Sequence, residues 1–150
     1  MPHVLGKEEG FILPVRGWEK WLEILHKILE DGAGKFYPWV KEKLDIPVKD
    51  AIGAAKLETA VAKLWCGPEQ ENEYPEATPE RVILRVTKCA WWERYNVLKL
   101  DPELRGGCDT CKVWCEEGLK AVNPKITRKY TKTIQRGDPY CKAIIEFKEE

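Results

Sequence analysis

Hydrophobic residues recur every three or four positions over the first part of the chain, which is the spacing of an amphipathic helix. The first such helix is predicted over residues 18–29 and ends at Asp31-Gly32. A second, short helix is predicted over residues 34–44, with Pro38 in its first turn, because a later proline would remove a backbone hydrogen bond. A third, alanine-rich helix is predicted over residues 47–65.

The pattern changes after the third helix. Residues 67–80 are polar and contain three prolines, which predicts a loop or an irregular edge. Hydrophobic residues alternate over residues 81–89, which places Val82, Leu84 and Val86 on one face. The β-branched content of this segment also predicts a strand.

The last third of the chain combines the helical spacing of hydrophobic residues with the alternation typical of strands. A short aromatic helix is predicted over residues 90–100, a glycine-containing turn over 101–107 and a helix over 109–121. Two alternating segments, 126–135 and 141–147, predict a C-terminal β-hairpin. Helices followed by strands, with a helix between them, predict an α+β protein.

We therefore expect N-terminal helices packed on a small antiparallel sheet, with a cysteine-bearing helix before the hairpin. At 150 residues the chain is long enough for one domain with its own core. That domain would have a helical part, residues 1–66, and a cysteine-rich sheet part, residues 80–148.

Composition narrows the range of partners and locations. Hydrophobic residues are 43% and charged residues 33%, as in a globular protein, and the 25 basic residues balance the 25 acidic ones. We expect no nucleic acid partner, because phosphate binding usually needs a basic excess. No apolar run approaches the roughly 20 residues of a membrane span, and no secretory signal is visible, so a cytoplasmic location is expected. Few Gln and Met beside many Lys and Glu suggest a thermophile.

Three of the six cysteines share a helical spacing. Cys108, Cys111 and Cys115 fall within roughly 60° of one another on a helix, and Cys141 could reach them from the hairpin. Four thiolates would suit zinc or an iron–sulfur cluster. Cys108 lies at the helix start, where a thiolate is favoured, so it is also a candidate nucleophile. The same helix face continues into hydrophobic residues, so burial in the core is the alternative.

Other candidate groups lie near these cysteines in the sequence. Trp91, Trp92 and Trp114 could form the aromatic wall of a small-molecule pocket, or they could belong to a Trp-rich core. Glu93 and Asp109 are acids that could move protons in a reaction.

The C-terminal hairpin carries a family resemblance. Residues 123–147, with the turn Gly137-Asp138-Pro139-Tyr140-Cys141, resemble the end of L-2-amino-thiazoline-4-carboxylate hydrolase-like proteins, and the resemblance covers roughly residues 80–148. The same ending is similar to 4-vinyl reductase domains and to the sensor domains of phenol-responsive activators. Tyr130 and Thr133 stand where the sensor pattern would have Glu and Cys, so a metal would have to use the helix cysteines.

The resemblance implies a small-molecule hydrolase that opens a cyclic amidine at a C–N bond. A thiolate or a metal-bound water would attack the amidine carbon. The alternative is a ligand or redox sensor whose cysteines hold zinc or an iron–sulfur cluster without turnover. Exposed aromatic residues would instead fit a homo-oligomer or a subunit of a larger complex.

Overall fold

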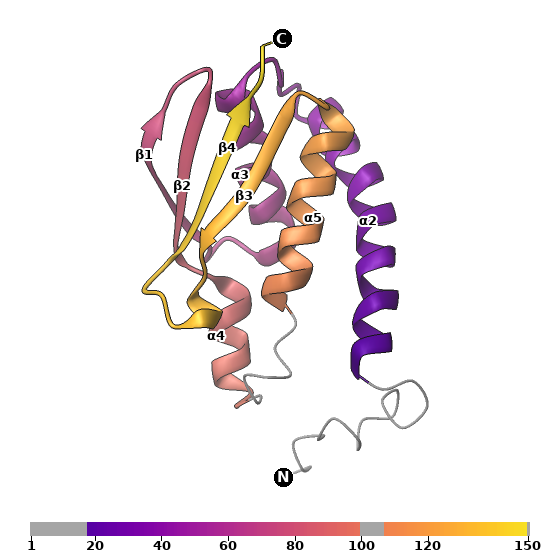
Figure 1. The fold of residues 1–150 in the computed structure, drawn as a ribbon, viewed down its shortest axis with the longest axis vertical. Helices are drawn as coiled ribbons and strands as arrows, with labels where there is room; N and C mark the ends of the chain where they lie inside the picture. Colours follow the sequence, from indigo (N-terminus) through magenta and orange to yellow (C-terminus); the bar gives the residue numbers. More distant parts are fainter. Residues whose placement is uncertain (1–17, 100–106, 150) are drawn as a thin grey trace.

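A computed structural model describes residues 18–99 and 107–149 of the chain (Figure 1). The helices are α2 (Trp18–Lys43), α3 (Ala51–Cys66), α4 (Ala90–Val97) and α5 (Gly107–Val122), and a short 3-10 helix is η2 (Ile134–Arg136). The strands are β1 (Glu71–Ala77), β2 (Arg81–Lys88), β3 (Ile126–Lys132) and β4 (Cys141–Phe147).

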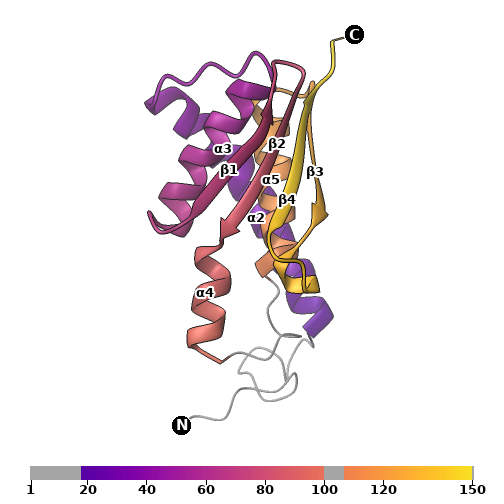
Figure 2. The same cartoon turned by 90° about the vertical axis from the view of Figure 1, so that its left-hand side faces the viewer.

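The strands form one antiparallel sheet in the order β1-β2-β4-β3. Helices α3 and α5 cover one face of this sheet, and α2 packs on the outer side of α5 (Figures 1 and 2). The predicted α+β class, with its cysteine-bearing helix and C-terminal hairpin, is confirmed.

Alternation of buried and partly exposed residues along the central strands β2 and β4 produces the sheet side of the core. In β2 the buried residues are Val82, Leu84 and Val86, and the residues between them are partly exposed. Strand β4 pairs with β2 so that Leu84 lies opposite Ala143 and Val82 opposite Ile145. The buried face of each strand therefore meets the helices, while the opposite face of the sheet has no helix packed against it in the part of the chain described.

Helix α2 is longer than predicted, because the two predicted helices are one. The helix continues through Gly32 and Gly34 and contains Pro38 in its interior. Interior proline costs about 3 kcal/mol of helix stability. Burial of Tyr37 and Val40, both fully inaccessible to solvent, offsets this cost. Tertiary packing, which the local pattern does not show, prevails over the helix-breaking residues.

Helix α3 starts later than predicted. Its N-cap is Asp50, whose side chain accepts a 2.8 Å hydrogen bond from the backbone N–H of Gly53. This contact satisfies one of the free N–H groups of the first turn. The predicted start at Pro47 was therefore wrong by one turn, although the helix end near Trp65 was close.

The predicted loop over residues 67–80 contains the edge strand β1. This strand pairs with β2 through two register irregularities, one after Glu71 and one between Glu73 and Glu76. Pro75 lies inside the second irregularity and is tolerated because an edge strand needs ladder bonds on one side only. Of the two predicted alternatives, the irregular edge is the one observed and the loop was wrong, since pairing with β2 compensates for the weak strand propensity.

The remaining elements follow the predicted pattern. Strand β2, helix α4, helix α5 and strand β4 lie within a few residues of their expected bounds. The predicted turn over residues 101–107 lies almost entirely outside the described residues. None of the helices in the described ranges has the length and apolar character to cross a membrane.

Candidate functional site

A cavity of about 410 Å³ lies between the helices and the sheet. This volume falls within the range of roughly 300–1,000 Å³ typical of small-molecule sites. Each of the four long helices and strands β1, β2 and β3 contributes to its wall. Most of the wall is apolar, and the stacked rings of Trp65 and Trp114, with centroids 4.5 Å apart, form one part of it.

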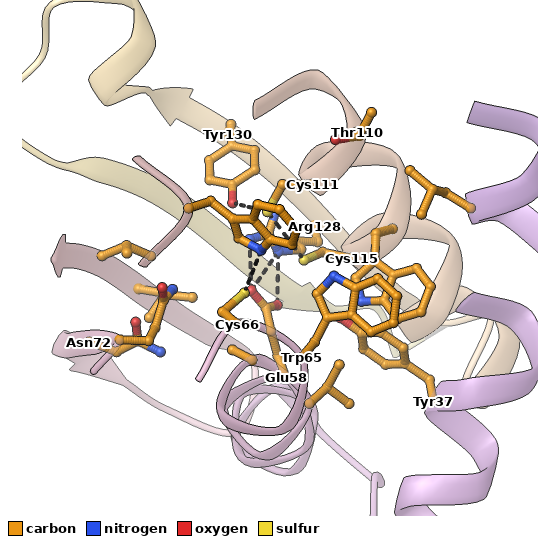
Figure 3. A pocket seen from close by; sticks show the side chains of 18 of the residues that line it. Tyr37, Glu58, Trp65, Cys66, Asn72, Thr110, Cys111, Cys115, Arg128 and Tyr130 are labelled. Atoms are coloured by element: carbon orange, nitrogen blue, oxygen red, sulfur yellow. Dashed lines mark hydrogen bonds and ion pairs between the residues drawn. The ribbon is translucent and has the colours of Figure 1, made fainter. Parts of the chain in front are cut away.

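A buried ion pair lies in the wall of this cavity (Figure 3). Glu58 of α3 accepts hydrogen bonds from Nε of Arg128 at 2.8 and 2.9 Å and from its Nη2 at 2.7 Å. Only 5% of the Glu58 side chain and 1% of the Arg128 side chain are exposed. The Arg128 guanidinium also lies 4.1 Å from the ring centroid of Tyr130.

The charge of Arg128 is secured by its surroundings. Burial alone would lower the pKa of Arg128, but its electrostatic interactions with Cys115 and Glu58 outweigh burial and raise the pKa. The guanidinium therefore stays charged. Its Nη1 is buried and has no hydrogen-bond partner among the described residues, so one N–H donor group is available at the cavity.

Three further polar atoms of wall residues are buried without a partner in the described part of the chain. They are Nε1 of Trp114, a donor, Oδ1 of Asn72, an acceptor, and the hydroxyl oxygen of Tyr37. Buried polar atoms are nearly always paired in native proteins, because an unpaired one costs about 1–3 kcal/mol. Four such atoms on residues around one cavity would suit a ligand that offers both acceptors and donors.

A group of thiols and a phenol lies beside the ion pair. Sγ of Cys111 is 3.9 Å from Sγ of Cys115 and 3.3 Å from the hydroxyl of Tyr130. Across the cavity, Sγ of Cys66 accepts a 3.1 Å hydrogen bond from Nε1 of Trp91. Figure 3 shows Cys66, Cys111 and Cys115 around Arg128.

These surroundings keep several of the thiols protonated. The hydrogen bond with Cys111, followed by burial, raises the pKa of Cys115. Burial raises the pKa of Cys66 to about 12 and also raises the pKa of Tyr130. Because the thiolate is the nucleophilic form, Cys66 and Cys115 are weak nucleophiles at neutral pH.

We expect iodoacetamide to modify Cys66 slowly at neutral pH. A pKa raised from the usual value of about 8.5 to about 12 means less thiolate at each pH below that value. The rate should therefore keep rising with pH beyond pH 9. Mass spectrometry of the Cys66 peptide over a pH series measures this rate. The same peptide in guanidinium-unfolded chain is the control, and equal rates at pH 7.5 would contradict the assigned environment.

The structure places two of the three predicted catalytic residues outside the cavity wall. Glu93 and Asp109 are exposed, and neither contributes to the cavity wall. Cys108 belongs to the first turn of α5, but its side chain lies outside the described residues. The catalytic roles of these three residues remain predictions.

Of the predicted aromatic wall, Trp91 and Trp114 line the cavity, whereas Trp92 does not. Trp91 is 36% exposed and Trp114 is buried. Binding of a ligand by the three tryptophans remains a prediction.

The predicted metal ligands fall into two places. Cys111 and Cys115 line the cavity, whereas Cys141 is buried with Leu84 and Ala143 and accepts a 3.3 Å hydrogen bond from the backbone N–H of Ile134. Within residues 18–99 and 107–149, no three His, Cys, Asp or Glu side chains are grouped as metal ligands. A zinc or iron–sulfur site that includes Cys108 therefore stays a prediction.

Sequence reasoning missed the ion pair. Arg128 alternates with Ile126 and Tyr130 on one strand face, so its position on the buried side of β3 was visible in the pattern. Glu58 lies among the alanines of α3, and this small-residue setting likewise indicated a position on a packed helix face. An ionisable residue at a core position is rare unless paired, and this rule would have identified both residues.

The fold and the cavity together define a small α+β protein in which helices on one face of an antiparallel sheet enclose a cavity of the size of a small molecule. Residues 10–145 match the model of the L-2-amino-thiazoline-4-carboxylic acid hydrolase family. The chain therefore belongs to this family, as the resemblance of the hairpin predicted.

Two solved structures share the fold at low sequence identity. A trafficking protein particle complex subunit 3 from Naegleria fowleri, covalently bound to palmitic acid, is 11% identical with a TM-score of 0.61, over 86% of this chain and 81% of that one. The phenol-responsive sensory domain of the transcription activator PoxR, with phenol, is 8% identical with a TM-score of 0.60, over 91% of this chain and 69% of that one. No curated protein matches the chain.

Proposed function

We propose that the cavity binds a small cyclic amidine that carries a carboxylate, and that the chain hydrolyses it. The observation that supports this most directly is Nη1 of Arg128, a charged donor in the cavity wall that is buried and unpartnered in the described part of the chain. A carboxylate is the group that an arginine N–H binds most strongly. Membership of the hydrolase family supports the reaction.

The charges of the wall agree with such a ligand. Glu58 already neutralises Arg128, so a ligand with a net charge would leave that charge uncompensated in the cavity. A protonated amidine with a carboxylate has no net charge. Its amidine N–H groups match the unpartnered oxygen of Asn72, and its carboxylate matches Arg128.

The chemical step would add water at the amidine carbon and break the ring C–N bond there, so that the carbon becomes a carbonyl and the ring nitrogen leaves as a protonated amine. Cys111 lines the cavity beside the Tyr130 hydroxyl, which makes it a candidate to attack that carbon or to move a proton. Cys108, one turn earlier on α5, is the second candidate. Glu93 or Asp109 would have to act from outside the cavity wall.

Binding without turnover is the second candidate function. It is favoured by the raised pKa values of Cys66 and Cys115, which keep these thiols protonated. Two proteins that share the fold hold ligands, palmitic acid in one and phenol in the other. In this case the chain would report the presence of a ligand to a partner.

Calorimetry with 2-aminothiazoline-4-carboxylate and with 2-aminothiazoline, which lacks the carboxylate, tests the binding proposal. A hydrogen bond to a charged group contributes about 1.5–3 kcal/mol, so the carboxylate should tighten binding roughly 10- to 100-fold. The double variant Glu58→Leu/Arg128→Met should lose this preference. Arg94→Met is the matched control, because Arg94 lies outside the cavity wall and pairs with Glu69 at the surface.

Mass spectrometry of the incubated amidine then separates the two functions. A ring-opened product that depends on wild-type protein and is lost in Cys111→Ser supports hydrolysis. Binding with no product supports the non-catalytic function. Equal affinity for the two compounds would contradict the role of Arg128.

A further inference from the structure

We propose that Cys111 and Cys115 form a two-thiol site for a monoorganic trivalent arsenical, whose organic group occupies the apolar part of the cavity. The site shares the cavity with the proposed amidine ligand but does not depend on the proposed reaction. It also differs from the four-cysteine metal site, because it uses neither Cys108 nor Cys141.

The geometry brings two thiols to one ligand. Cys111 and Cys115 are one turn apart on α5, their sulfur atoms are 3.9 Å apart, and both line the cavity. A single atom that bonds both sulfurs needs them within about this distance, so small side-chain rotations suffice. Helix α5 fixes both Cα positions, which reduces the entropy that chelation would otherwise cost.

The reaction balances without an oxidant or a reductant. The arsenical carries one organic group and two hydroxyl groups on arsenic. Each thiol forms an As–S bond and releases its proton, one As–O bond breaks at each step, and two water molecules leave. Arsenic remains trivalent and the sulfurs are not oxidised. The thiols react in their protonated form overall, so no base in the cavity is required.

Charge disfavours a cuprous ion or a four-thiolate zinc at this site. The dithiolate of a monoorganic arsenic is neutral, whereas two thiolates on a cuprous ion carry one negative charge and four thiolates on zinc carry two. The cavity wall already contains a compensated pair, Glu58 and Arg128, so a neutral adduct adds no buried charge. An uncompensated charge in such a site is costly.

The wall beside the thiols accounts for the organic group. Trp114 lies on α5 between Cys111 and Cys115 in sequence and stacks on Trp65 of α3, and both rings line the cavity. Val61 and Ala62 of α3 continue this apolar lining. A phenyl group has the shape and polarity to pack there, whereas inorganic arsenite has no group to bury.

Intact-mass measurement of the full chain with phenylarsine oxide tests the proposal. We expect one phenylarsenic unit per chain and the loss of two thiols from subsequent iodoacetamide labelling. Cys111→Ser and Cys115→Ser should each lose the stable adduct. Cys108→Ser and Cys66→Ser should retain it, and Cys66 is the closer control because it also lines the cavity.

A second variant tests the contribution of the cavity itself. Ala62→Phe leaves both thiols in place but fills the space expected for the phenyl group. Burial of an aromatic group contributes about 1.5–3 kcal/mol, so the affinity for phenylarsine oxide should fall roughly 10- to 100-fold. The affinity for arsenite should change little in the same variant.

Three results would overturn the proposal. They are an unchanged adduct in Cys115→Ser, loss of the adduct in Cys108→Ser, and an equal loss of affinity for phenylarsine oxide and for arsenite in Ala62→Phe. Each is read from the mass of the adduct. Amidine binding and ring opening are read separately, so failure of one proposal is distinguishable from failure of the other.

Discussion

Glu58→Gln should lower the free energy of unfolding by about 3–5 kcal/mol, because it leaves a buried guanidinium without its counter-charge. Both partners of the Glu58–Arg128 pair are at most 5% exposed, and three hydrogen bonds join them. Arg128 would keep its charge but lose its ionised acceptor. Denaturation by guanidinium chloride, followed by Trp fluorescence, measures the change.

Two controls separate this effect from a general sensitivity of the fold. Glu58→Leu/Arg128→Met removes both charges at similar volume and should be close to wild type or more stable, since apolar replacement of a buried pair is often neutral. Glu69→Gln breaks the exposed pair with Arg94, whose side chains are 40% and 47% exposed, and should cost at most about 1 kcal/mol. A loss in the double variant as large as in Glu58→Gln would show that the pair itself stabilises the fold.

Gly118→Ala should be the most damaging of the conservative substitutions in α5. A Cβ atom at Gly118 would lie 2.2 Å from the Tyr37 ring, far inside van der Waals contact. Tyr37 is completely buried and its ring packs against Trp114, so the ring could yield only by moving into the cavity that it lines. Overpacking of this kind costs about 1–3 kcal/mol and occasionally more, and the midpoint of thermal unfolding should fall accordingly.

Gly34→Ala is the matched control for this prediction. Gly34 lies in α2, and a Cβ atom there would have no neighbour within 4 Å. Alanine is favoured over glycine in a helix by about 0.8–1.0 kcal/mol, so this variant should be more stable than wild type. If Gly118→Ala were as stable as Gly34→Ala, the close contact between α2 and α5 would be wrong.

Local patterns predicted the elements whose burial alternates simply. Strands β2 and β4 were visible because their buried residues alternate, as with Leu84 and Ala143. The continuity of α2 was not visible, because Pro38 is a strong local break signal and the packing of Tyr37 that offsets it is tertiary. Strand β1 was predicted only as one of two alternatives, a loop or an irregular edge, since its pairing with β2 cannot be read from its own residues.

The candidate site was predicted in part. The helical spacing of Cys111 and Cys115 correctly placed both sulfurs on one face, and the structure puts them 3.9 Å apart. The Glu58–Arg128 pair was not predicted, because 70 residues separate its members in sequence. Spacing rules apply within one element, whereas this pair depends on how α3 packs against β3.

The irregular edge strand β1 has a consequence for the solubility of the protein. An exposed strand edge can pair with a second chain and begin aggregation, and proteins prevent this with bulges, prolines and charges at the edge. Strand β1 has all three, namely two register irregularities, Pro75 and the acidic side chains of Glu71, Glu73 and Glu76. Growth of the sheet by edge-to-edge addition is therefore disfavoured at β1.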